Sequence, residues 1–367
     1  MKTNDETKKN SRITGKERIT NILQKKSRDV ICWTTLGPKI IGEEEISKLP
    51  ILELYRHIGC DILQLGVSSS PSRFKQPDIE VKQQMNSDGS NTVTTTSKWG
   101  KLIAVWQNSH PLKYPVETIE DLRTFKNIML NSFYEEIPGD EFERNVYKTI
   151  NDIGDDGIAV NTIAPSPVQA LLECDCGVIN FYSLYQDYPE EMEELLDVMH
   201  HHRKQEYEIL SKRTPLDCVI PIENTSTRMI SPDLYEKLSL PQISDYVNIL
   251  HKHNKLAVLH MCGHLKDLLY LFRDTGCDGI NAVTLPPLGN TRFEDVLEVL
   301  GDDFIILGGI FSPFQDPNIS KEEMWHELDK LYTPAIRNAN LLLWMQADGV
   351  YTPYERFLWT KEWFEKQ

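Results

Sequence analysis

Short apolar runs alternate with longer amphipathic segments along most of this chain, beginning near residue 29. Apolar runs of about four to eight residues are typical of buried parallel strands, and the amphipathic segments between them are typical of helical crossovers. The segment 189–212 supports this interpretation, because it opens with proline and acidic residues as a helix N-terminus does. The predicted strands are 29–36, 61–67, 157–164, 218–224, 256–262, 278–283, 304–310 and 341–346.

Eight strands with helical returns predict a (β/α)8 TIM barrel, an α/β fold in which the sheet closes on itself. The alternative on this pattern is an open doubly wound sheet. Residues 91–115 interrupt the order, because they alternate β-branched and polar side chains around Lys98, Trp99 and Gly100. This predicts a β-hairpin inserted after the second strand. We therefore expect a flexible N-terminal tail over 1–15 and a single barrel domain over 16–367.

The net charge of the chain limits the kinds of molecule that it is expected to bind. With 39 Lys and Arg against 55 Asp and Glu, the formal net charge is -16, so nucleic acid is not expected as a partner. The N-terminal segment lacks the apolar core of a secretory signal, and no run approaches the roughly 20 apolar residues of a membrane span. We expect a cytoplasmic protein with no membrane partner. The seven cysteines are then expected to be free thiols or metal ligands.

Polar residues at strand ends are the candidates for function, because the C-terminal ends of barrel strands share one opening. His260 and Cys262 end the fifth predicted strand, and residues i and i+2 of a strand point to the same side. Imidazole and thiolate together are a good pair of ligands for Zn²⁺. The other polar residues at strand ends are Asn161, Glu223, Asn224, Asn281, Gln346 and Asp348.

A catalytic zinc ion usually has three protein ligands and one open position, so a third ligand is required. Glu223 is the first candidate, because it ends the strand that precedes His260 and Cys262. Asp348, after the last strand, is the second, and His264 in the next helix is the third. The alternative for the pair itself is structural, with His260 hydrogen-bonded to a backbone carbonyl and Cys262 packed in the core.

Several local patterns, taken in order, resemble the uroporphyrinogen decarboxylase superfamily. They extend from about residue 11 to about residue 360. They include "SRITGKERITNIL" at the start, "SKWGKLIAVW" in the predicted hairpin, "APSPVQALLECDCGVINFYSLYQDYPEEMEELLD", "HKHNKLAVLHMCGHLKDLLYLFRDTGCDGIN" and "DGVYTPYERF" near the end. The resemblance implies the same barrel with an inserted hairpin.

The sequence departs from two branches of that superfamily. The decarboxylases proper carry an arginine-rich signature around the first strand, and the segment 29–40 has no arginine. The His-Met-Cys-Gly sequence at 260–263 instead resembles the zinc-dependent methyltransferases that work with corrinoid proteins. In those that act on coenzyme M, a cysteine before a Thr-Pro near the C-terminus is a third zinc ligand. Here Ala347 and Asp348 occupy that region.

The resemblance therefore implies a methyltransferase that binds Zn²⁺ and meets cobalamin on a corrinoid partner protein. Because a sulfur ligand is replaced by oxygen, we favour transfer of a methyl group from a methoxylated aromatic ether to cob(I)alamin. The alternatives are methyl transfer from methylcobalamin to a thiol such as coenzyme M, a cofactor-free decarboxylase, and a barrel that only binds its ligand. The oligomeric state stays open, with a homodimer as one option. The expected catalytic residues are Glu223, His260 and Cys262, and the expected contacts to the small-molecule methyl donor or acceptor are Asn161, Asn224, Trp344, Gln346 and Tyr351.

Overall fold

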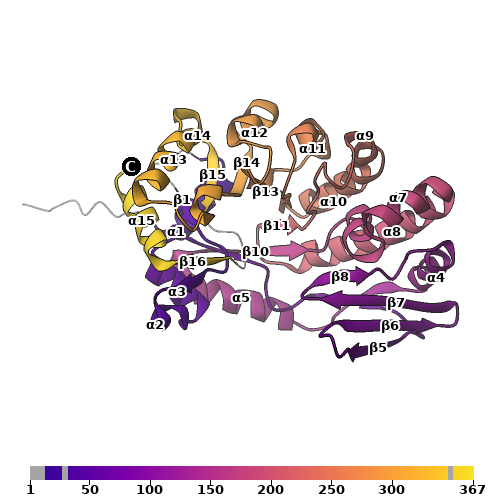
Figure 1. Cartoon of the computed structure of the whole chain (residues 1–367). Coiled ribbons are helices and arrows are strands. Elements are labelled where there is room, and N and C mark those ends of the chain that lie inside the picture. The colour runs from indigo at the N-terminus through magenta and orange to yellow at the C-terminus, as the bar shows by residue number, and fades with distance from the viewer. Residues whose placement is uncertain (1–12, 27–31, 346–349) are drawn as a thin grey trace, which may run out of the picture.

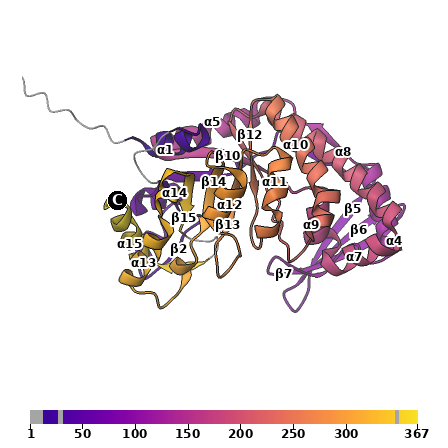
Figure 2. The same cartoon turned by 90° about the horizontal axis from the view of Figure 1, so that it is seen from above.

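The computed structural model describes residues 13–26, 32–345 and 350–367, and it contains a parallel sheet of eight strands. Along the sheet the order is β1-β15-β14-β13-β12-β11-β10-β3, which is the order of a (β/α)8 barrel. All eight predicted strands are present, and Figures 1 and 2 show the helices around them. The strands are β1 (Cys32–Thr34), β3 (Ile62–Leu65), β10 (Gly157–Ile163), β11 (Cys218–Pro221), β12 (Leu256–His260), β13 (Gly279–Thr284), β14 (Ile305–Ile310) and β15 (Asn340–Trp344).

The barrel closes at the seam between β1 and β3. The Asp61 N–H donates to the Trp33 carbonyl at 3.0 Å, which joins the two ends of the sheet. The Nε of Arg18, on helix α1 (Gly15–Leu23), lies 3.1 and 3.0 Å from the two carboxylate oxygens of Asp61. The apolar face of α1 is buried against the barrel interior. This helix therefore covers the N-terminal end of the barrel, opposite the opening where function is expected.

Helices return the chain from the end of one strand to the start of the next. Helices on the outside of the barrel include α3 (Ile51–Ile58), α5 (Glu141–Ile153), α8 (Pro189–Arg213), α10 (Leu240–Lys252), α11 (Leu269–Thr275), α12 (Phe293–Leu300), α13 (Lys321–Leu331) and α15 (Tyr354–Glu365). The remaining helices and helical turns are α2 (Glu44–Ser47), α4 (Ile119–Leu130), α6 (Pro167–Ala170), α7 (Gly177–Asp187), α9 (Pro232–Leu234), α14 (Pro334–Asn338), η1 (Gly154–Asp156), η2 (Leu171–Asp175), η3 (Tyr235–Ser239), η4 (Lys266–Leu268) and η5 (Ser312–Gln315). In the described part of the chain, no helix combines the length and the apolar character that crossing a membrane requires.

An antiparallel sheet of four strands occupies the place where a single hairpin is predicted. Its central strands β6 and β7 have Ser97 opposite Gly100, and the structure adds one strand on each side of this pair. Helix α4 packs against both β7 and α8, and Figure 1 shows the sheet beside these helices. The strands are β5 (Glu80–Met85), β6 (Asn91–Ser97), β7 (Gly100–Gln107) and β8 (His110–Lys113). Two smaller sheets pair β4 (Ser72–Lys75) with β9 (Phe133–Glu136), and β2 (Lys39–Ile41) with β16 (Tyr351–Pro353).

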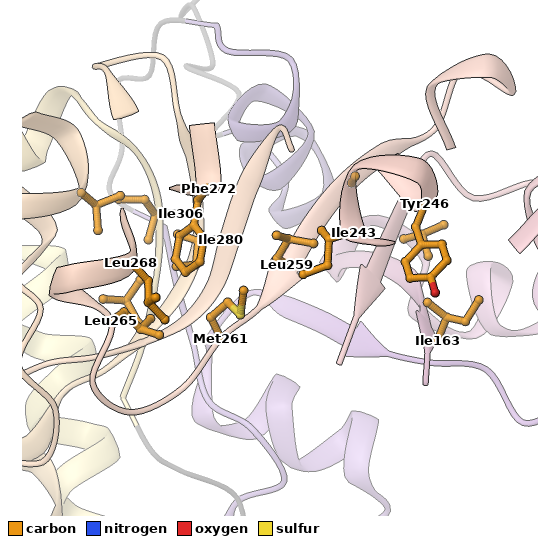
Figure 3. Packing of buried hydrophobic residues seen from close by; sticks show 14 of the residues in the cluster. Ile163, Ile243, Tyr246, Leu259, Met261, Leu265, Leu268, Phe272, Ile280 and Ile306 are labelled. Atoms are coloured by element: carbon orange, nitrogen blue, oxygen red, sulfur yellow. The ribbon is translucent and has the colours of Figure 1, made fainter. Parts of the chain in front are cut away.

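Two hydrophobic layers lie on the two sides of the barrel wall. The inner layer takes side chains from all eight strands, including Val258 of β12. The outer layer lies between strands and helices and includes Leu259 and Met261, as Figure 3 shows. Because neighbouring residues of an extended chain point to opposite faces, His260 lies on the inner face. Cys262 also packs against the inner layer, so both members of the predicted pair face the barrel interior.

Candidate functional site

His260 is the last residue of β12, at the C-terminal end of the barrel. Its Nδ1 lies 2.6 Å from the Oδ1 of Asn281, on the neighbouring strand β13. The amide nitrogen of Asn281 donates to the Leu307 carbonyl, so the amide oxygen faces the histidine. Nδ1 therefore carries the proton and Nε2 keeps a lone pair. Burial lowers the pKa of His260, which favours the neutral imidazole that a metal ion binds.

Cys262 contacts Asn224, which follows the neighbouring strand β11. The Sγ of Cys262 lies 3.6 Å from the Oδ1 of Asn224. The backbone of Asn224 has a positive φ of 46°, a conformation that asparagine adopts more readily than most residues, and its N–H donates to the His260 carbonyl at 2.9 Å. Burial raises the pKa of the Cys262 thiol, and the nearby negative charge of Glu173 adds to this. Asn224 therefore lies at the opening, where its contact with a small molecule stays a prediction.

Glu173 belongs to this group, although sequence reasoning misses it. It lies on the π-helical turn η2, and its Oε2 accepts a hydrogen bond from the Nδ2 of Asn224 at 3.4 Å. Burial raises the pKa of Glu173, and the hydrogen bond from Asn224 opposes this shift. The sequence analysis selected polar residues at the ends of strands as site candidates, and Glu173 lies on a helical segment instead. The available signal is an acidic residue inside the largely apolar run 167–174, directly after a strand.

The structure places Glu223 on the other side of the barrel wall. Cys218 and Ile220 of β11 belong to the inner layer, so Glu223 lies on the opposite face of the chain. Its carboxylate is fully buried and accepts two hydrogen bonds from Ser166. It therefore does not join His260 and Cys262, and its prediction as the third metal ligand is not supported by this geometry.

The other predicted site residues lie in several environments. Asn161 is buried in the outer layer and accepts a hydrogen bond from the Thr214 hydroxyl, so it does not reach the opening. Trp344 is the last residue of β15 and belongs to the inner layer, where its ring covers Gly308. Tyr351 is exposed on β16, outside the barrel wall. Gln346 and Asp348 lie outside the described residues.

Two metal-ligand candidates thus remain together at the opening, His260 and Cys262. Over residues 13–26, 32–345 and 350–367, no three His, Cys, Asp or Glu side chains are grouped as a metal ion requires. The backbone N–H of His264 donates to the Ser226 hydroxyl at 3.1 Å, and its Nε2 is buried with no hydrogen-bond partner among the described residues. His264 and Asp348 therefore both stay predicted third ligands that the geometry leaves untested.

Replacing Asn281 with alanine is expected to weaken metal binding at His260 by about 10- to 100-fold. The reason is that Asn281 fixes both the tautomer and the orientation of the imidazole ring. A zinc dissociation constant from chelator competition measures this effect. Asn340→Ala is the matched control, because it removes another buried asparagine that donates to a backbone carbonyl, at the start of β15 and away from His260. Wild-type affinity in Asn281→Ala would show that another contact orients His260.

A family model for uroporphyrinogen decarboxylase (URO-D) matches residues 158–330, a range that contains both His260 and Cys262. The matched range is a little under half of the chain, and over this range the chain resembles the uroporphyrinogen decarboxylase family. The family resemblance seen in the local sequence patterns is thereby confirmed. A search of curated protein sequences gave no significant match.

Two solved structures are similar to this chain, and the first of them supports its fold. A methyltransferase from Methanosarcina mazei has a TM-score of 0.59 and 15% sequence identity, and the match covers 97% of this chain and 99% of that chain. An AP endonuclease of family 2 from Brucella melitensis has a TM-score of 0.35 and 9% identity, with 62% and 85% of the two chains covered. The first likeness extends over nearly the whole of both chains, so the two proteins share one overall fold.

Proposed function

We propose that the protein is a zinc-dependent methyltransferase that works with a corrinoid protein and removes the methyl group of a methoxylated aromatic ether. The observation that carries the proposal is the pair of His260 and Cys262 on the inner face at the barrel opening. The match of residues 158–330 to the uroporphyrinogen decarboxylase family model supports it. The fold shared with a protein described as a methyltransferase also agrees with it.

The residues at the opening fit two ligands of a zinc site. His260 offers the lone pair of Nε2 on a neutral imidazole, and Cys262 offers a thiol that loses its proton when a metal binds. Asp348 is the proposed third ligand. Zinc held there would supply a Lewis acid for an ether oxygen, which makes a phenolate a better leaving group.

The reaction direction follows from the donor set of this chain. One thiolate and one imidazole, with an oxygen ligand in third place, make a harder site than two thiolates do. Such a site favours an oxygen of the substrate over a sulfur. In the proposed reaction the bond between the methyl carbon and the ether oxygen breaks, and the methyl group passes to the corrinoid of the partner. The oxygen keeps the bonding electron pair and takes up a proton from solvent.

The test is an anaerobic methyl-transfer assay with the full chain, free cob(I)alamin as the acceptor, and 2-methoxyphenol as the methyl donor. The proposal expects absorbance of methylcobalamin to appear with wild type and not with His260→Ala. The reverse assay supplies methylcobalamin and 2-mercaptoethanesulfonate. If only the reverse assay shows turnover, the substrate of the enzyme is a thiol acceptor and not an ether donor. Loss of carboxyl groups from a porphyrinogen, unaffected by a chelator, would overturn the methyltransferase assignment.

A further inference from the structure

Helix α6 and the π-helical turn η2 follow strand β10 and form one helical segment at the barrel opening. The segment begins at Ser166, which is almost fully buried. The Ser166 N–H donates to one carboxylate oxygen of Glu223 at 2.8 Å, and the Ser166 hydroxyl donates to the other at 2.6 Å. A carboxyl group that uses both of its oxygens on one residue fixes the position of that residue more strongly than a single hydrogen bond does.

The residue after Glu223 contacts the same segment further along. The Nε2 of Gln169 lies 3.4 Å from the Asn224 carbonyl, and the Nδ2 of Asn224 lies 3.4 Å from the Oε2 of Glu173. Asn224 in turn contacts the thiol of Cys262. Glu223 therefore holds the start of the segment, and Asn224 contacts its middle. The two residues are neighbours after β11, and their side chains point to opposite faces of the barrel wall.

The far end of the segment rests on the chain that leaves the inserted sheet. The Val116 N–H donates to the Asp175 carbonyl at 3.0 Å. The ring of Tyr114 lies so close to Gly177 that a Cβ there would be 2.4 Å from it. The segment is thus supported at its end, and its start depends on Glu223.

We propose that Glu223 is a positioning residue: by holding Ser166 it sets the place of the α6–η2 segment, and so the place of Glu173 beside Asn224 and Cys262. The contact itself is independent of the reaction, and only its importance for catalysis rests on the function proposed above. In the outer layer the carboxylate is shielded from water, where hydrogen bonds are stronger and an unmade one costs more. Loss of the Glu223 carboxyl is therefore expected to displace the α6–η2 segment at the opening, although Glu223 itself does not reach the opening.

Backbone amide hydrogen exchange of the full-length protein at pH 5 tests this role. The variants are Glu223→Ala, Ser166→Ala and Glu223→Gln. We expect exchange in the peptide 170–176 to become about tenfold faster in the two alanine variants. Glu223→Gln should exchange like wild type, because a glutamine amide can accept from the Ser166 N–H and donate to the Ser166 hydroxyl. The faster exchange should extend to the peptide that contains Asn224.

Asn161→Ala is the matched control, because it also removes a buried hydrogen bond from the outer layer but makes no contact with Ser166. It should leave exchange in 170–176 unchanged. Zinc content is measured on the same samples and should be equal in wild type and Glu223→Gln. Wild-type exchange in both alanine variants, or zinc lost from Glu223→Gln alone, would overturn the positioning role. Absence of zinc from wild type would instead defeat the proposed function, while the exchange data still decide the role of Glu223.

Discussion

Replacing His260 with alanine is expected to lower the zinc content of the purified protein from about one ion per chain to nearly none. The reason is that the proposed zinc site depends on the imidazole Nε2 and the thiol of Cys262, and a single thiol does not hold zinc. Cys262→Ala should have the same effect. Methyl transfer should fall by more than about 100-fold in both variants. Elemental analysis of protein prepared without a histidine tag measures the metal.

His251→Ala is the matched control for these two variants. It removes a histidine whose Nε2 already lies 2.8 Å from the carboxylate of Asp278, away from the proposed site. We expect its zinc content to equal that of wild type. Zinc retained in both His260→Ala and Cys262→Ala would place the metal elsewhere in the molecule.

Glu223→Gln is expected to be more stable than wild type at pH 8, by up to roughly 3 kcal/mol in the free energy of unfolding. Burial raises the pKa of Glu223 to about 7, although the hydrogen bonds from Ser166 oppose this shift. Between about pH 4.5 and pH 7 the folded state keeps a proton that the unfolded state has lost. The stability of wild type therefore falls as the pH rises through this window and is lowest above it. A neutral glutamine carries no such penalty.

Urea unfolding at pH 5 and pH 8 measures the difference. The two proteins should be close in stability at pH 5 and should separate at pH 8. Glu208→Gln is a control of opposite sign, because the hydrogen bond from His253 lowers the pKa of Glu208. That exposed variant should lose a little stability at pH 8. Equal pH dependence in wild type and Glu223→Gln would show that the carboxyl of Glu223 titrates normally in the folded protein.

The eight barrel strands could be predicted because burial on both faces makes each of them a short, continuous apolar run. Position at a strand end was enough to select His260, Cys262 and Asn224, since the strand ends of a parallel barrel meet at one opening. The same alternation that places Val258 and His260 inside also places Glu223 outside. Applying the same two-residue alternation to β11 would therefore have placed Glu223 on the opposite face from His260 and Cys262.

Two features could not be predicted from the sequence. Strand β5 of the inserted sheet is exposed at every position, so no apolar run marks it, and it is defined only by its pairing with β6. Glu173 reaches Asn224 because η2 is a π-helical turn, and this turn has no local sequence signature. The partner of β5 is the adjacent strand β6, whereas the partner of Glu173 is Asn224 in a distant part of the chain.

The pairing of β1 with β15 has a consequence for synthesis of the protein. Cys32 lies opposite Leu342, so the first strand finds this neighbour only after more than 300 further residues have been made. At typical rates of translation this takes roughly 15–60 s. During that time one edge of β1 has no partner in the barrel, and a nascent chain with such an edge is a natural client for chaperones near the ribosome.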